Sequence, residues 1–221
     1  VGEPAFKDQP GLNAHMIITD APGKHVFVPC LGSNHVAQYI LDEATGQLKA
    51  NTPATFPTVK GAGPRHLAFH PNGKFAYLLG ELDSTIYSLA YDAEKGLLSQ
   101  IEVQPTLPAG TTVKNSTAHV LVSPCGKFVY SSNRGHDSIA IFAVNQDTGK
   151  LTLVGHETGG GEIKTPRNFT LDLSARYMLV ASQKTNVVTV FKRDAERGTL
   201  QKLNTTTVPA GPSFVGVMPG Q

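Results

Sequence analysis

Five polar residues of this 221-residue chain could together bind and process a small anionic molecule. They are His15, Arg65, Glu81, Arg134 and Arg167. An arginine guanidinium can hold a phosphate or carboxylate through two parallel hydrogen bonds, and beside a reacting carbonyl it can stabilise a developing oxyanion. Histidine titrates near neutral pH and can activate water, while a glutamate can orient it or share that role. These residue types predict acid–base chemistry on an anionic substrate, with no metal or cofactor required.

A repeat of about 50 residues must position these side chains. Its hairpin signals recur at spacings of 50, 53 and 49 residues, as Pro22-Gly23-Lys24, Asn72-Gly73-Lys74, Cys125-Gly126-Lys127 and Ser174-Ala175-Arg176. A second marker is an Asp or Asn with a Gly four residues later. It recurs in the same register at 42–46, 92–96, 145–149 and 194–198. Short β-branched and aromatic runs lie between the turns, without a helical period. The pattern predicts an all-β fold of β-propeller blades, because a β-sandwich, the alternative, would not explain a fixed register over four copies.

The repeat register selects the candidate residues. We count from the central residue of each hairpin turn, which is Gly23, Gly73, Gly126 or Ala175. The residues eight positions earlier are His15, Arg65, Ala118 and Arg167. The residues eight positions later are Leu31, Glu81, Arg134 and Gln183. In an antiparallel hairpin we expect these two positions to face each other across the strand pair. The five polar members should therefore converge on one mouth of the ring.

The C-terminal residues match the start of a repeat. Gly211-Pro212-Ser213-Phe214-Val215 is similar to Gly63-Pro64-Arg65-His66-Leu67. We therefore expect a single propeller domain with blades at about 14–63, 64–117, 118–165 and 166–211, and the first strand of a fifth blade at 212–221. Such an arc would be part of a longer ring. Its unpaired strand edges favour self-association or pairing with missing N-terminal blades.

Composition and charge argue against several function classes. The chain is 40% hydrophobic with a net charge of +2, and its Lys and Arg residues are scattered, so nucleic-acid binding is not expected. No apolar run approaches the roughly 18 residues that a membrane span needs. No signal peptide is visible, which favours a cytoplasmic protein and leaves a periplasmic or secreted one open. Cys30 and Cys125 should not be bridged, because the repeat puts one at the mouth end and the other in an opposite-end turn.

Each candidate also has a purely structural interpretation. Arg65 or Arg167 could form an ordinary ion pair, His15 could bond a neighbouring turn, and Glu81 could neutralise an arginine. Structural positions of a repeat would carry similar apolar residues in every copy, so the varied polar residues here favour a shared site. Further histidines lie close to the same motifs and, without metal-ligand spacing, are expected to form hydrogen bonds: His66, His70, His119 and His136.

Several longer motifs resemble the lactonase family of seven-bladed β-propellers. They are Gly61-Ala62-Gly63-Pro64-Arg65-His66, Phe69-His70-Pro71-Asn72-Gly73, Glu81-Leu82-Asp83-Ser84, Ser132-Asn133-Arg134-Gly135-His136-Asp137-Ser138 and Pro166-Arg167-Asn168-Phe169. That family includes propeller-type 6-phosphogluconolactonase and the fungal carboxy-cis,cis-muconate cyclase. The resemblance covers essentially the whole chain and implies that about three N-terminal blades are missing.

The resemblance implies catalytic residues at His15, Arg65, Glu81 and Arg134. Substrate contacts are expected from Arg167, His66 and His136. The chain departs from the family pattern at Gly80, His119, Leu121 and Cys125. These departures bear on the exact substrate more than on the fold.

Three functions fit these residues. The first is hydrolysis of a phosphorylated sugar-acid lactone by the full-length parent protein, with water activated by His15 or Glu81, the choice between them left open. As an open arc without the other blades, this chain is expected to show weak activity or none. The second is lactonisation of a carboxylated diene acid, which needs the same arginines and a proton donor. The third is a non-catalytic binding platform, since a fold does not fix a function.

Overall fold

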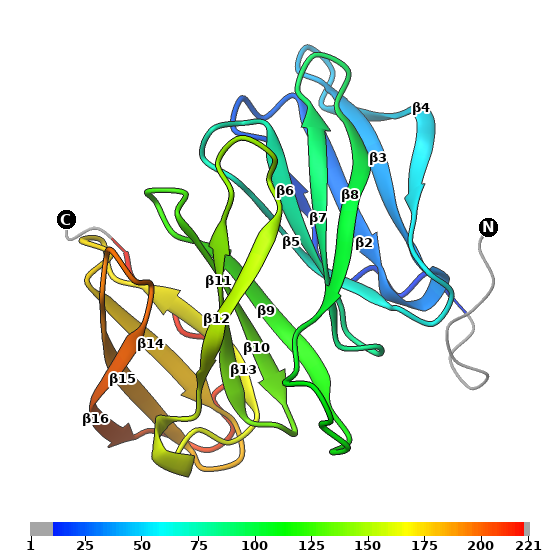
Figure 1. Cartoon of the computed structure of the whole chain (residues 1–221). Coiled ribbons are helices and arrows are strands. Elements are labelled where there is room, and N and C mark those ends of the chain that lie inside the picture. The colour runs from blue at the N-terminus through cyan, green and yellow to red at the C-terminus, as the bar shows by residue number, and fades with distance from the viewer. Residues whose placement is uncertain (1–10, 219–221) are drawn as a thin grey trace. The chain divides into compact units, whose positions relative to one another are not determined.

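A computed structural model describes residues 11–218 of the protein (Figure 1). The chain divides into two compact units, an N-terminal unit up to residue 105 and a C-terminal unit from residue 106. Each unit holds two four-stranded antiparallel sheets, and in each sheet the strands lie side by side in sequence order. This meander arises because every strand is joined to the next by a short turn.

The N-terminal unit contains the first two sheets. The first is built from β1 (Ile18–Thr19), β2 (His25–Cys30), β3 (His35–Asp42) and β4 (Gln47–Pro57), with the 3₁₀ turn η1 (Leu31–Ser33) between β2 and β3. The second is built from β5 (Pro64–Phe69), β6 (Phe75–Gly80), β7 (Thr85–Asp92) and β8 (Leu97–Pro105). The two sheets share one apolar core, which includes Phe27, Leu67 and Tyr87.

The C-terminal unit repeats this arrangement. Its first sheet is built from β9 (Ser116–Val122), β10 (Phe128–Arg134), β11 (Ser138–Val144) and β12 (Leu151–Glu157). Its second is built from β13 (Pro166–Leu171), β14 (Tyr177–Ser182), β15 (Val187–Arg193) and β16 (Leu200–Thr207), preceded by the 3₁₀ turn η2 (Gly159–Gly161). Tyr130, Phe169 and Phe191 belong to the apolar core that the two sheets share.

The predicted all-β fold of four blades is confirmed, but the strand of a fifth blade is not formed. The described residues 208–218 contain no strand. In the four blades the first strand pairs with the second strand of its own blade, whereas no strand among the described residues pairs with 212–218. This segment is tied to the fourth blade only through single contacts, such as the Val215 N–H donated to Asn168 Oδ1 at 2.9 Å.

The first repeat marker is a tight turn that needs a left-handed residue. Gly23, Gly73 and Gly126 have φ values of 78°, 70° and 73°, and Ala175, the copy without glycine, has 55°. A polar side chain shortly before the turn accepts a backbone N–H from the returning strand in three blades. Asp20 accepts from His25, Ser123 from Phe128 and Asp172 from Tyr177. Glycine preference and capping together explain why this marker is visible in the sequence.

The second repeat marker packs one blade against the preceding blade of the same unit. A Cβ atom on Gly96, whose φ is +66°, would overlap the ring of His25. In the C-terminal unit a Cβ atom on Gly198, whose φ is +73°, would overlap the ring of Phe128. Glycine is therefore required at these two turns both by the backbone angle and by the approach of a buried ring.

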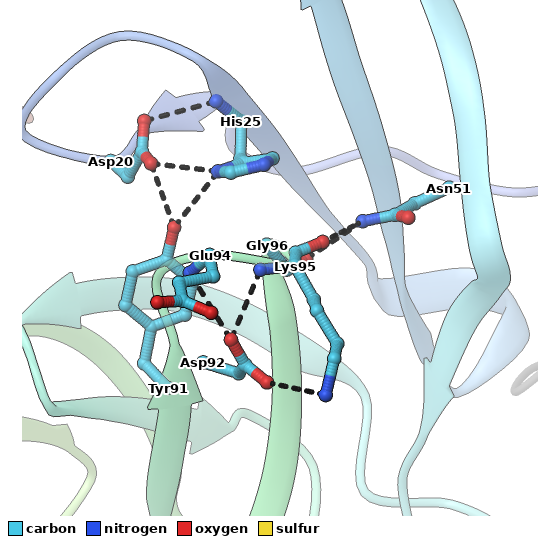
Figure 2. Close-up of polar contacts among 8 residues, drawn as sticks. All are labelled: Asp20, His25, Asn51, Tyr91, Asp92, Glu94, Lys95 and Gly96. Atoms are coloured by element: carbon cyan, nitrogen blue, oxygen red, sulfur yellow. Dashed lines mark hydrogen bonds and ion pairs between the residues drawn. The ribbon is translucent and has the colours of Figure 1, made fainter.

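A buried polar network fixes the ring that faces Gly96 (Figure 2). His25 Nδ1 lies 2.9 Å from Asp20 Oδ2, and the Tyr91 hydroxyl donates to the same oxygen at 2.7 Å. Burial raises the pKa of the Asp20 carboxyl, but hydrogen bonds from the His25 backbone and the Tyr91 hydroxyl outweigh it and leave that pKa below its usual value. Burial, together with the Asp20 charge, raises the pKa of Tyr91. The network joins the first blade to the second through an ionised, fully hydrogen-bonded carboxylate.

Both cysteines are free, as predicted. Cys30 is buried at the end of β2, where burial raises the pKa of its thiol, and Cys125 is exposed in the turn between β9 and β10. We expect a thiol reagent to modify one cysteine rapidly in the folded protein and both after unfolding without reductant, because the thiolate is the reactive form. Ellman titration before and after adding guanidinium checks this. Fewer than two thiols in the unfolded protein would contradict the free state of the pair.

Candidate functional site

A β-bulge near the start of the first strand directs the candidate side chains. Between the pairs formed at Pro64 and Leu67, β5 has two residues where the facing β6 has one. The two residues are Arg65 and His66. The same register shift occurs in β9 and in β13, at the repeat positions of Ala118 and Arg167. Bulges redirect side chains and are common beside active sites.

The predicted facing pairs are wrong by two residues because of this geometry. The Glu81 N–H donates to the carbonyl of Gly63 at 2.9 Å, and Arg134 pairs with Ser116. The pairing is already shifted by one residue next to the turn, where Leu67 pairs with Leu78 and not with Leu79. The bulge adds the second residue of the shift. The extra residue nevertheless lets a first-strand side chain reach the end of the second strand.

The N-terminal unit brings four predicted site residues together. Arg65 Nε lies 2.7 Å from Glu81 Oε2, and the Arg65 side chain is 2% exposed while that of Glu81 is 17% exposed. Arg65 Nη1 lies 3.0 Å from His66 Nε2. The rings of His66 and His15 have centroids 5.2 Å apart and are tilted by 60°. The interpretation of Glu81 as a partner of Arg65 is thus correct, and His15 and His66 complete the cluster.

Hydrogen-bond chemistry separates the roles of the two histidines. A guanidinium has only donors, so the Arg65 contact makes His66 Nε2 the acceptor and puts the proton of that ring on Nδ1. His66 is therefore a neutral residue that, together with Glu81, fixes the plane of the Arg65 guanidinium. His15 is the half-buried neighbour of His66 and is the residue of this cluster suited to exchange a proton with water.

The C-terminal unit holds Arg134 in the wall of a small cavity. Arg134 Nη2 donates to the carbonyl oxygen of Thr117 at 2.8 Å. The cavity has a volume of about 320 Å³, and its lining includes two lysines, Lys114 and Lys184. Neither lysine was among the sequence candidates, because both fall outside the positions eight residues from a turn. Lys184 directly follows Gln183, the register position of its blade, so a search of the adjacent residues would have found it.

The other predicted contacts have different environments. Arg167 is half-buried at the β13 bulge, does not line this cavity, and its side chain has no hydrogen bond or ion pair with residues 11–218. His136 Nδ1 lies 2.8 Å from Ser138 Oγ, and burial with the neighbouring charge of His156 lowers the pKa of His136. His136 is therefore neutral at pH 7, and any anion contact from it would be an uncharged hydrogen bond.

Two further histidines have structural environments. His70 is buried, and its Nδ1 accepts the backbone N–H of Asn72 at 3.2 Å, as expected of a hydrogen-bonding residue. The ring of His119 packs edge-on against Phe169, with centroids 5.0 Å apart. Within residues 11–218 no group of three or more His, Cys, Asp or Glu side chains is arranged to hold a metal ion. No helix in that range is long and apolar enough to span a bilayer.

The two groups of candidates belong to different units. His15, Arg65, His66 and Glu81 meet in the N-terminal unit. Arg134, His136 and Arg167 belong to the C-terminal unit. The convergence of both groups on one mouth stays a prediction.

The sequence matches the family described as "Lactonase, 7-bladed beta-propeller" over residues 2–217. A 6-phosphogluconolactonase of Pectobacterium carotovorum is 36% identical over 219 residues, covering 99% of this chain and 64% of the relative. A periplasmic gluconolactonase of Pseudomonas aeruginosa is similar in structure, with a TM-score of 0.87 and 32% identity over 96% of this chain and 59% of the other. A protein from Lactobacillus plantarum has a TM-score of 0.88 and 37% identity, over 95% of this chain and 60% of the other. The chain therefore spans less than two thirds of the length of these proteins.

Proposed function

We propose, because this chain belongs to the lactonase family of seven-bladed β-propellers, that the cluster in its N-terminal unit hydrolyses the lactone of a phosphorylated sugar acid. The observation that carries the proposal is the buried guanidinium of Arg65, which contacts Glu81 and His66, while the ring of His15 packs against that of His66. A fixed cation and a histidine base in one cluster suit the attack of water on a carbonyl group. The names of the Pectobacterium and Pseudomonas relatives support a lactone as the substrate class.

The reaction needs one base and one oxyanion partner. His15 takes a proton from water as the water oxygen bonds to the lactone carbonyl carbon, and Arg65 stabilises the negative charge that develops on the carbonyl oxygen. The bond between that carbon and the ring oxygen then breaks. The proton held by His15 passes to the departing alkoxide, which leaves an open-chain hydroxy acid. Glu81 and His66 act by positioning Arg65.

The proposal predicts a large effect at His15. Replacing His15 by Gln should lower kcat for the lactone about 10²- to 10⁴-fold, the usual contribution of a general base. Alkali uptake at constant pH gives the rate, and NMR of the product distinguishes ring opening from the lactonisation of a diene acid. His35→Gln is the control, since His35 is a half-buried histidine of the same unit that contacts the Ser33 carbonyl. A wild-type chain without lactone hydrolysis, or a His15→Gln variant with unchanged kcat, would refute the proposal.

A further inference from the structure

The cavity beside Arg134 in the C-terminal unit is lined by three cationic residues. Lys114 precedes β9, Arg134 ends β10, and Lys184 follows β14. None of the residues that line the cavity is acidic. Its volume of about 320 Å³ lies at the small end of the range for ligand pockets, roughly 300–1,000 Å³, so it suits a small group.

The two lysines are not neutralised by the protein. The side chains of Lys114 and Lys184 form no ion pair with any carboxylate of residues 11–218. The nearby carboxylate of Asp137 is already used: it accepts the backbone N–H of Gly135 and of Thr165 and lies 3.5 Å from Lys164 Nζ. Cations gathered around one cavity repel each other, and a bound anion would remove that repulsion.

The backbone holds the cavity wall in place. A Cβ atom on Gly135, whose φ is +125°, would overlap the carbonyl oxygen of Lys114, so the end of β10 lies directly against the segment that carries this lysine. Arg134 is oriented by its bond to the Thr117 carbonyl, and its Nε atom is buried. Ser116 and Thr165 add hydroxyl groups to the lining. The cavity thus combines a planar guanidinium, the ammonium groups of two exposed lysines and two hydroxyls, a donor set that matches the oxygens of a phosphate dianion.

We infer that Lys114, Arg134 and Lys184 form a binding site for the phosphate group of a small anion. The site lies within the C-terminal unit, and the inference is independent of the reaction proposed for the cluster of the N-terminal unit. It assigns anion recognition to two lysines that lie outside the repeat register. It also gives Arg134 the role of binding a phosphate.

Isolating the phosphate contribution requires a pair of ligands and a pair of variants. Calorimetric titration of the full chain with 6-phosphogluconate and with gluconate measures the anion site without turnover. Lys114→Gln and Lys184→Gln should each weaken binding of 6-phosphogluconate about tenfold, the loss of one charge-assisted contact, and leave gluconate binding unchanged. Lys150→Gln, an exposed lysine in the turn between β11 and β12, is the matched control and should change neither.

The outcomes separate the anion site from the proposed function. If both lysine variants lose affinity for 6-phosphogluconate and keep their affinity for gluconate, the anion site stands, whether or not the chain hydrolyses a lactone. If wild type binds 6-phosphogluconate no more tightly than gluconate, or if neither lysine variant changes that preference, the anion site is wrong and the proposed function is unaffected. An equal loss of gluconate and 6-phosphogluconate affinity would also overturn the anion site.

Discussion

Replacing Glu81 by Leu should lower the free energy of unfolding by about 3–5 kcal/mol, because it leaves the buried Arg65 guanidinium without its carboxylate. The guanidinium stays protonated, so arginine cannot avoid the burial of an unpaired charge by becoming neutral. Since Arg65 would no longer be fixed for the oxyanion, kcat should also fall, by about 10²- to 10³-fold. The double variant Arg65→Met/Glu81→Leu should recover most of the stability, since no charge then remains buried, and none of the activity.

Urea unfolding of Glu81→Leu, Arg65→Met and the double variant measures the free energies of unfolding, and the lactone assay measures kcat. Lys49→Met is the control, because the Lys49–Asp42 pair lies in the same unit with the lysine 64% exposed. Its loss should cost less than about 1 kcal/mol. If Glu81→Leu proves no more destabilising than Lys49→Met, the pair of Arg65 and Glu81 is not the buried ion pair described above.

The second large effect is expected at Gly96. Alanine there should destabilise the protein by about 3–5 kcal/mol, through the strain of a left-handed alanine and the overlap of its methyl group with His25. Moving the His25 ring would also disturb its contacts with Asp20 and Tyr91 (Figure 2). The turn would therefore lose packing and polar contacts together.

Gly46→Ala provides a matched comparison for Gly96→Ala. Gly46 occupies the same turn position in the first blade with a φ of +68°, and a Cβ atom there would meet nothing within 4 Å. Its N–H donates to the Asp42 carbonyl as that of Gly96 does to Asp92. Alanine at Gly46 should thus cost only the backbone strain, about 1–2 kcal/mol. Equal changes in urea midpoint for both variants would show that contact with His25 contributes nothing.

The blades could be predicted from the sequence because their markers are under local physical constraint. Gly23 and its equivalents need a left-handed angle, and Gly96 needs both that angle and the absence of a side chain. Such requirements leave glycine at fixed spacings, and the β-branched runs between them can only be strands.

The bulge could not be predicted in the same way. A bulge depends on how two strands are paired, and the distance from Arg65 to the turn is the same with or without it. The predicted facing of Arg65 and Glu81 was therefore wrong at the level of the backbone pair, although the two side chains do meet.

Counting eight residues from each turn missed Lys114 and Lys184 for a different reason. They come from separate blades of the C-terminal unit, and only the folded chain brings them to one cavity. Charge alone did not distinguish them, because the chain has 19 Lys and Arg residues scattered along its length.

The most direct test of the central claim, that the cluster of His15, Arg65 and Glu81 is the reacting centre, is an NMR titration of the histidine rings. The full chain, labelled with ¹³C and ¹⁵N in histidine, is titrated with 6-phosphogluconate, the open-chain product of the proposed reaction. The account predicts saturable shifts of the His15 and His66 ring signals, while those of His25 and His35 stay in place. Saturable binding that leaves the His15 and His66 signals unchanged would contradict it.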